Sequence, residues 1–307
     1  MHGGFVNEIV LTLRIMPRSP LLIKSGAEGD LQIDPTLPDM NFVRTYRNGR
    51  SEVYLPGSSL RGVLRSHAER LIRSVEPEVG NGKGACDPNL EKGSRGPLRP
   101  ACFRGEKELT EKTGPEAYNQ SCRACRIFGN TALAGRVRIE DFHLADRSEP
   151  RLEVRHGVAI DRVTGSVAQG PFEMEILVDG EFRGSLTIRN FTLGQFALLC
   201  ASLLDIGDGL VPIGFGKSKG LGRVQLRFDE LMYRTIEKHE GQIRGVGSLA
   251  PHLGKDYRLP PPELEVASWP LEAKPLRGFW VSESSSHETI RTILEGLVPL
   301  WLREVGR

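Results

Sequence analysis

Four short segments of the chain have the apolar–polar pattern of β-strands, and two longer segments repeat apolar residues at helical spacing. The predicted strands are residues 5–15, 136–142, 182–191 and 223–228. The predicted helices are residues 56–73, which open on a Pro-Gly-Ser-Ser capping sequence, and residues 192–205. The resulting order, β-α-β-β-α-β, predicts an α+β fold with a ferredoxin-like (RRM-like) core.

Large insertions interrupt this predicted core. Residues 17–48 are rich in Pro, Gly and Asp, which predicts a long loop. Residues from about 76 to 135 contain a polar, Gly-rich insertion, and residues from about 155 to 181 have the pattern of a long hairpin. Both insertions are expected to project from the core.

The character of the sequence changes after the last predicted strand. We therefore divide the chain into a core domain of residues 1–230, which carries both insertions, and a C-terminal extension of residues 231–307. The run Pro260-Pro261-Pro262 predicts that the extension is a loosely structured arm, closed by an amphipathic helix at residues 287–305.

Charge and composition place few limits on function. The 41 Lys and Arg residues and 39 Asp and Glu residues leave a formal net charge of +2. The pI of about 8.3 is below the value of about 9 that indicates a nucleic-acid-binding domain by itself. Any anion site must therefore be found locally. No apolar run approaches the ~20 residues of a membrane span, and no signal peptide opens the chain. We expect a cytoplasmic protein with no membrane partner.

Four of the five cysteines gather within one insertion, and their number and spacing indicate a metal site. Cys122 and Cys125 form a knuckle that can fill two tetrahedral positions of Zn²⁺, and Cys86 and Cys102 can fill the others. A bound metal would stabilise an insertion that has little core of its own. The alternative is four unrelated reduced thiols. Cys200 lies within an apolar helix and is expected to be a core residue.

Two short motifs are suited to binding phosphate. The first, LPGSSLRG at residues 55–62, places Ser58, Ser59 and Arg61 at a helix N-terminus, where free N–H groups and the helix dipole attract anions. The alternative is an ordinary capped helix. The second motif, GFGKSKGLGR at residues 214–223, combines backbone-exposing glycines with basic side chains before a strand. The alternative for this motif is a flexible hairpin turn.

Together these motifs resemble the hallmarks of the RAMP superfamily over roughly residues 5–230. Two further segments match the same family: CRACRIFG at residues 122–129 and AIDRVTG at residues 159–165, which is similar to the start of a hairpin called the thumb. The resemblance is strongest to the repeating backbone subunits of type III CRISPR effector complexes. It implies that the partners are crRNA, complementary target RNA and other subunits of the complex, including further copies of the backbone subunit.

The resemblance also implies roles for individual residues. It implies zinc in the cysteine-containing insertion, sometimes with a His ligand, which makes His67 a reserve candidate. The thumb would wedge its apolar tip, including Val163, into the neighbouring guide–target duplex. The residues expected to contact RNA are Ser58, Ser59, Arg61, Arg162, Val163, Gly214, Gly216, Lys217, Ser218, Lys219, Gly220 and Arg223.

Members of the family that cleave target RNA use an Asp in the loop after the first strand, with Mg²⁺ or Mn²⁺. Asp39 fits this pattern best because an apolar pair and a basic residue follow it, and Asp34 and Asp30 are in reserve. The alternative for Asp39 is an exposed, solvated carboxylate. Two rival functions stay open: a scaffold subunit that binds guide without cutting, and a standalone crRNA-processing ribonuclease. The place of His67 on an apolar helix face argues against the ribonuclease, which would need a His or Tyr base.

Overall fold

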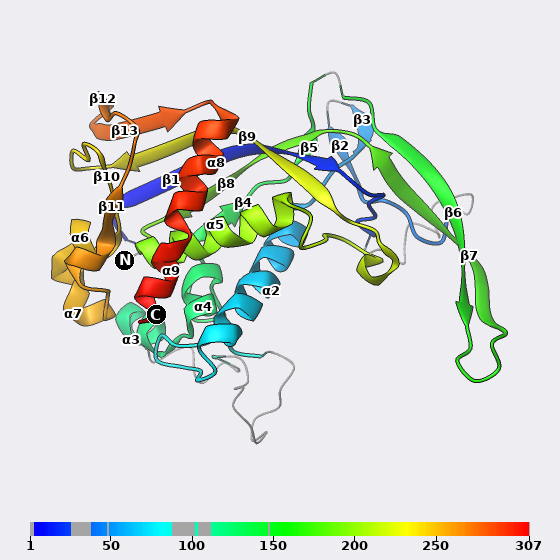
Figure 1. Ribbon diagram of the computed structural model, residues 1–307, viewed down its shortest axis with the longest axis horizontal. Coiled ribbons are helices and arrows are strands. Elements are labelled where there is room, and N and C mark those ends of the chain that lie inside the picture. The colour runs from blue at the N-terminus through cyan, green and yellow to red at the C-terminus, as the bar shows by residue number, and fades with distance from the viewer. Residues whose placement is uncertain are drawn as a thin grey trace.

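The structure, a computed structural model, describes residues 3–25, 38–47, 49–87, 102–103, 112–146 and 148–306, with only the backbone at position 169. Within these residues seven strands form one antiparallel sheet in the order β12–β13–β9–β1–β8–β4, with β5 also paired to β8 (Figure 1). Their bounds are β1 Asn7–Pro17, β4 Val137–Ile139, β5 His143–Leu144, β8 Phe182–Arg189, β9 Val224–Thr235, β12 Lys274–Leu276 and β13 Phe279–Ser284.

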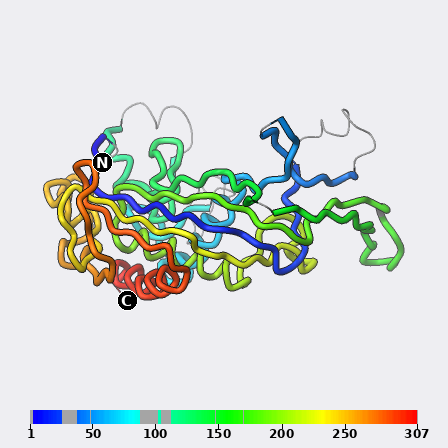
Figure 2. Tube along the Cα trace, turned by 90° about the horizontal axis from the view of Figure 1, so that it is seen from above, coloured from blue at the N-terminus to red at the C-terminus, as the bar shows by residue number. Residues whose placement is uncertain are grey.

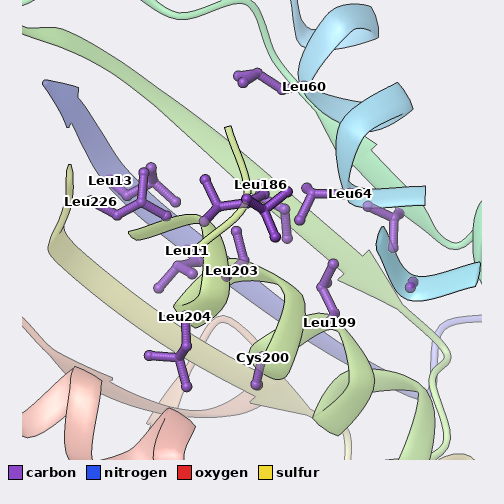
Figure 3. Close-up of a cluster of buried hydrophobic side chains, with 14 of the residues drawn as sticks. Leu11, Leu13, Leu60, Leu64, Leu186, Leu199, Cys200, Leu203, Leu204 and Leu226 are labelled. Atoms are coloured by element: carbon purple, nitrogen blue, oxygen red, sulfur yellow. The ribbon is translucent and has the colours of Figure 1, made fainter. Parts of the chain in front are cut away.

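Two long helices, α2 (Gly57–Val75) and α5 (Leu193–Gly207), pack on one face of the sheet (Figure 1). Leucines of β1, β8 and β9 meet leucines of both helices in a continuous buried core (Figure 3). The labelled members of this cluster are Leu11, Leu13, Leu60, Leu64, Leu186, Leu199, Cys200, Leu203, Leu204 and Leu226. Among the described residues no helix lies on the opposite face of the sheet, as the view from above shows (Figure 2).

The central strands β9–β1–β8–β4 and the two helices follow the chain order β1–α2–β4–β8–α5–β9. This is the ferredoxin-like connectivity, so the fold predicted from the sequence is confirmed. Helix α5 begins where expected because Thr192 and Gln195 form a reciprocal capping box. Cys200 is fully buried in α5, as the apolar pattern predicted.

Two hairpins extend from one end of the sheet (Figure 1). The longer one, β6 (Arg151–Ile160) and β7 (Val167–Asp179), begins slightly earlier than the predicted hairpin and corresponds to the thumb segment. The shorter one, β2 (Arg44–Arg47) and β3 (Arg50–Val53), lies partly within the segment that was predicted to be only a loop. The prediction missed β2 because four residues are too few to show a clear period.

The prediction of a loosely structured C-terminal arm is wrong. Strand β9 continues to Thr235, and β13 pairs with it to widen the main sheet. A buried aromatic cluster explains this order, because Trp269 is 1% exposed and its ring lies edge-on to that of Tyr233 on β9. The small elements there are β10 Gln242–Arg244, α6 Val246–Leu249, α7 Gly254–Tyr257, β11 Val266–Ser268 and the 3₁₀ turns Pro251–Leu253 and Pro262–Glu265.

The predicted last helix is two helices, α8 (His287–Leu297) and α9 (Pro299–Glu304). Pro299 interrupts the helix because it has no backbone N–H to donate. Buried Ile290, Leu294 and Trp301 on the two helices join the main hydrophobic core. Within the described residues no helix combines the length and apolar character needed to cross a membrane.

Candidate RNA interface and metal centre

The glycine-rich loop after α5 is a fixed structure and not a flexible turn. Its backbone is tied to the segment that follows β1: Phe215 N–H donates to Leu22 O (2.7 Å) and Gly222 N–H to Pro20 O (2.9 Å). Gly214 and Gly222 have φ values of 77° and 90°, and a Cβ at either would collide with a backbone carbonyl oxygen. Glycine is therefore required at both positions.

The loop presents its basic residues to solvent. Lys217 to Lys219 form a single 3₁₀ turn between two glycines, and Lys217, Ser218, Lys219 and Arg223 are all exposed. The Lys219 ammonium lies 5.3 Å from the centre of the Phe172 ring, which ties the loop to the base of the thumb. The pinned backbone holds these cations at one place on the surface.

The two phosphate-binding motifs face each other across a groove of about 380 Å³. Helix α2 contributes residues one turn apart, and the segment after β1 and the glycine-rich loop contribute the other wall. The lining residues are Ile23, Lys24, Ser59, Gly62, Val63, Ser66, Gly214, Phe215 and Lys217. We call this the α2–loop groove.

Electrostatics in this groove favour an anion. The pKa of Lys217 is lowered, first by burial and then by the positive charge of Arg70, which lies one further turn along α2. No acidic residue occupies the first turn of α2. A phosphate placed near Lys217 would relieve its repulsion with Arg70. The N-terminus of α2 lies several turns from Arg70, and there Gly57 N–H donates to Asp141 Oδ1 (2.8 Å).

The structure separates the predicted residues of the first motif. Ser59 lines the α2–loop groove, whereas Ser58 is exposed beside it. Arg61 turns the other way: its guanidinium donates to Phe128 O at the end of α4 (Arg123–Phe128). The expectation that Arg61 lies in the phosphate site is therefore not met by its position.

Several groove residues were missed by the sequence reasoning. Lys24 follows β1 in a segment without regular pattern, and nothing in the sequence marks it. Gly62, Ser66 and Arg70 share the α2 face of Ser59 at spacings of three, seven and eleven residues. Helical periodicity from Ser59 was the signal that could have found them.

The four predicted cysteines come together. Their sulfur atoms all lie within 4.8 Å of one another, and Cys86 Sγ and Cys125 Sγ are 3.7 Å apart. Four ligands at the Zn–S distance of about 2.3 Å in a tetrahedron have sulfurs about 3.8 Å apart, so this cluster has the size of a metal site. Among the described residues it is the only place where three or more metal-ligating side chains meet.

The surroundings of the cluster favour thiolates. Backbone N–H groups of Cys122 and Cys86 donate to the sulfurs of Cys102 (3.2 Å) and Cys122 (3.5 Å), and Arg65 donates to Cys125 Sγ at 3.4 Å. Hydrogen bonds from the other thiols, Cys102 first, hold the pKa of Cys86 well below its usual range, whereas hydrogen bonds within the cluster raise the pKa of Cys102 (Cys122 first) and of Cys125 (Cys102 first). The donor set and its charge environment fit Zn²⁺, which binds deprotonated thiols.

His67 is not part of this cluster. Its Nε2 lies 2.6 Å from Asp205 Oδ2 on α5, so the side chain ties α2 to α5. The reserve proposal of His67 as a metal ligand is wrong, because four cysteines already complete the set. The Nε2 of His67 is taken up by Asp205 and its Nδ1 is buried, so no ring nitrogen faces a substrate, which does not suit a general base for RNA processing.

Asp39 is exposed and held in a defined position. Its Oδ2 accepts a hydrogen bond from Glu173 N–H (2.8 Å) on thumb strand β7, and Met40 next to it pairs with Met174 of the same strand. Phe42, three residues on, is 1% exposed and anchors the segment in the core. Asp30 and Asp34 lie outside the described residues.

The thumb ends in an ordered turn with apolar side chains on its surface. Asp161 Oδ1 accepts from the N–H groups of Val163 (2.9 Å) and Thr164 (2.7 Å). Val163 is 92% exposed and Arg162 is also exposed, as expected of residues that contact a partner. The hydrogen bonds of the turn hold these two residues at the surface, away from the hydrophobic core.

The architecture therefore defines a class: a ferredoxin-like protein with a basic groove, a thumb and a four-cysteine centre. The family model of the RAMP superfamily matches residues 14–225, and the chain belongs to this superfamily. This membership supports a CRISPR-associated, RNA-binding role. No curated protein matches the chain.

Proposed function

We propose that this protein is a crRNA-binding backbone subunit of a type III CRISPR effector complex. The α2–loop groove is the observation that carries the proposal, because two motifs far apart in sequence meet there and the groove is lined by the cations Lys24 and Lys217. Further copies of the same chain along one guide would repeat this contact. Base pairing between guide and target, and not the protein, would supply sequence specificity.

Guide binding is tested by removing the groove cations. We expect Lys217→Ala/Lys219→Ala to weaken crRNA binding for all guide sequences alike and to reduce the slope of log K against log salt by about two. The matched control is Lys255→Ala/Lys274→Ala, which removes the same charge from exposed positions in the C-terminal extension. Equal binding by both double variants, or a loss confined to particular guide sequences, would contradict the proposal.

We further propose that Asp39 takes part in cleavage of target RNA. Its carboxylate is exposed at the base of the thumb, where an RNA strand held by the thumb would pass. Mg²⁺ is commonly held in enzymes by one or two carboxylates together with substrate phosphates, and when bound it stabilises charge on the reacting phosphate. Asp39 would supply the protein carboxylate of such a site.

A non-catalytic scaffold is the second candidate. The observation that favours it is that no described His, Asp or Glu joins Asp39 in a group of three metal-ligating side chains. Incubation of the assembled complex with matched target RNA and Mg²⁺ separates the two candidates. Target binding without any cutting by the wild-type complex would establish the scaffold.

A structural zinc ion completes the proposal. Cys86, Cys102, Cys122 and Cys125 would hold it, and it would fix the insertion against α2 through α4. Elemental analysis of protein purified without added metal should find close to one zinc per chain.

A further inference from the structure

The short hairpin β2–β3 carries an aromatic ring with nothing packed on it. Tyr46 is 81% exposed, and among the exposed large apolar and aromatic side chains of the described residues only Val163 is more exposed. A Tyr ring in water contributes nothing to the core, whereas Tyr is enriched at binding surfaces because it combines a rigid ring with a polar tip. The position therefore indicates a contact with a partner.

The charges on the hairpin indicate that the partner is an anion. Arg47 and Arg50 are paired directly across the two strands, an arrangement in which like charges destabilise a hairpin. Glu52 offsets part of this charge, since it lies 3.7 Å from Arg47 and 3.0 Å from His143. Arg50 is exposed, and no described residue forms an ion pair with it. A phosphate would remove the repulsion.

The hairpin is attached to the thumb strand that also holds Asp39. The Arg44 guanidinium makes two bonds to the Glu175 carboxylate on β7 (2.6 and 2.7 Å), and Glu175 also accepts from Phe42 N–H (3.0 Å). Asp39 is bonded to the same strand at Glu173, two residues away. In Figure 2 the hairpin stands out from the sheet on the side where the thumb begins.

Strand alternation fixes the direction of Tyr46. Residues two apart in a strand share a face, so Tyr46 lies on the face of Arg44 and one step farther out. The segment from Asp39 to Arg44 runs along β7 from Glu173 to Glu175, so the hairpin begins past the Arg44–Glu175 pair and Tyr46 lies farther out still. An RNA strand that follows this segment from Asp39 would reach the hairpin.

We propose that the β2–β3 hairpin is a clamp for the RNA strand that passes Asp39: Tyr46 on one face of the hairpin stacks on an unpaired or displaced base, and Arg50 on the opposite face, next to its cross-strand partner Arg47, binds a phosphate of the same strand. The identification of this RNA strand as the target RNA rests on the proposed function. Stacking suits a site that must accept any sequence, since every base has a flat π-face.

The test compares Tyr46→Ala with Tyr46→Phe, which keeps the ring, in complexes assembled on crRNA. We expect Tyr46→Ala to weaken target binding at least about five-fold and Tyr46→Phe to bind like wild type. Arg50→Gln should reduce the salt slope of target binding by about 0.7 to 1. The matched controls are Leu276→Ala and Arg277→Gln, from the exposed β12–β13 hairpin at the other end of the molecule.

The inference and the proposed function can fail separately. Normal guide binding with equal target affinity for Tyr46→Ala and Leu276→Ala would overturn the clamp alone. Unchanged target affinity with fewer copies per guide in Tyr46→Ala, measured by native mass spectrometry, would overturn it in favour of a protein–protein contact. Binding of a short unpaired RNA by the free chain needs no guide, so Tyr46→Ala should weaken it even if the crRNA assignment fails. No loss there would also overturn the clamp.

Discussion

The two ends of the molecule treat their charged and aromatic groups in opposite ways (Figure 1). At the closed end, formed by the cysteine-containing insertion and the C-terminal extension, the charged groups that join these two parts are largely buried and paired. Arg123 lies between Glu76 (2.8 Å) and Glu304 (2.6 Å), and Glu304 accepts from Thr192 at the start of α5 (2.8 Å). These interactions are completed within the chain.

At the open end, formed by the thumb, the β2–β3 hairpin and the glycine-rich loop, comparable groups face solvent. Val163, Tyr46 and Lys219 are all exposed, yet ordered backbone holds each of them in place. Holding exposed residues in one conformation costs conformational entropy, and the free energy of binding a partner can offset that cost. The comparison teaches that the closed end serves stability and the open end serves recognition.

The strongest test of this division is to remove a cysteine at the closed end. We expect Cys122→Ser to lose the bound zinc and to lower the free energy of unfolding by several kcal/mol, because the insertion depends on the metal for stability. Thermal melts and elemental analysis measure both effects. Cys200→Ser is a control for a buried thiol outside the cluster, since it should destabilise without removing zinc. Full zinc content and unchanged stability in Cys122→Ser would show that the site does not exist.

At the open end, the largest expected effect is on cleavage. Asp39→Asn should lower the rate of target cutting by about 100-fold or more, while target affinity stays near that of wild type. Asp256→Asn, a change of an exposed carboxylate in the C-terminal extension, serves as the control. Normal target cutting by Asp39→Asn would show that another residue supplies the active carboxylate.

A buried carboxylate at the closed end gives a pH test of intermediate size. Burial raises the pKa of Glu265 to about 8, although Leu193 N–H and Gly247 N–H both donate to it. The folded state therefore holds a proton that the unfolded chain releases near pH 4.5, so stability should fall as the pH rises from about 5 to 8.

Glu265→Gln should flatten this dependence by about 3 kcal/mol between pH 5 and pH 8. Chemical denaturation at several pH values measures it, and the exposed neighbour Glu263→Gln is the control. If wild type and Glu265→Gln lose stability in parallel over that range, the carboxyl group is not neutral in the folded protein.

The smallest expected effect on stability is at the tip of the thumb. Val163→Ala should change the free energy of unfolding by less than about 0.5 kcal/mol, because the side chain is 92% exposed. Target cleavage by the assembled complex should nevertheless fall several-fold, since a smaller wedge displaces a base less well. A large loss of stability in Val163→Ala, with normal cleavage, would reverse the assignment of this end to recognition.

The sequence alone predicted those features that depend on residues close together in the chain. The ferredoxin-like order and the four cysteines were read from local pattern, and the structure confirms the fold and the clustering. The thumb tip was implied by the family resemblance, and the structure shows it exposed. Local signals sufficed here because periodicity and capping depend on neighbours a few residues away.

Only the tertiary structure decided which motifs meet and which side chains turn away. Arg61 belongs to a phosphate-binding motif but donates to Phe128, whereas Lys24 belongs to none and lines the groove. The C-terminal extension was predicted to be loose from its Pro-rich run, but it is ordered by the pairing of β13 with β9 and by the contact between Tyr233 and Trp269. Each outcome depends on contacts between residues distant in the chain, and their free energy is set by packing that no local pattern encodes.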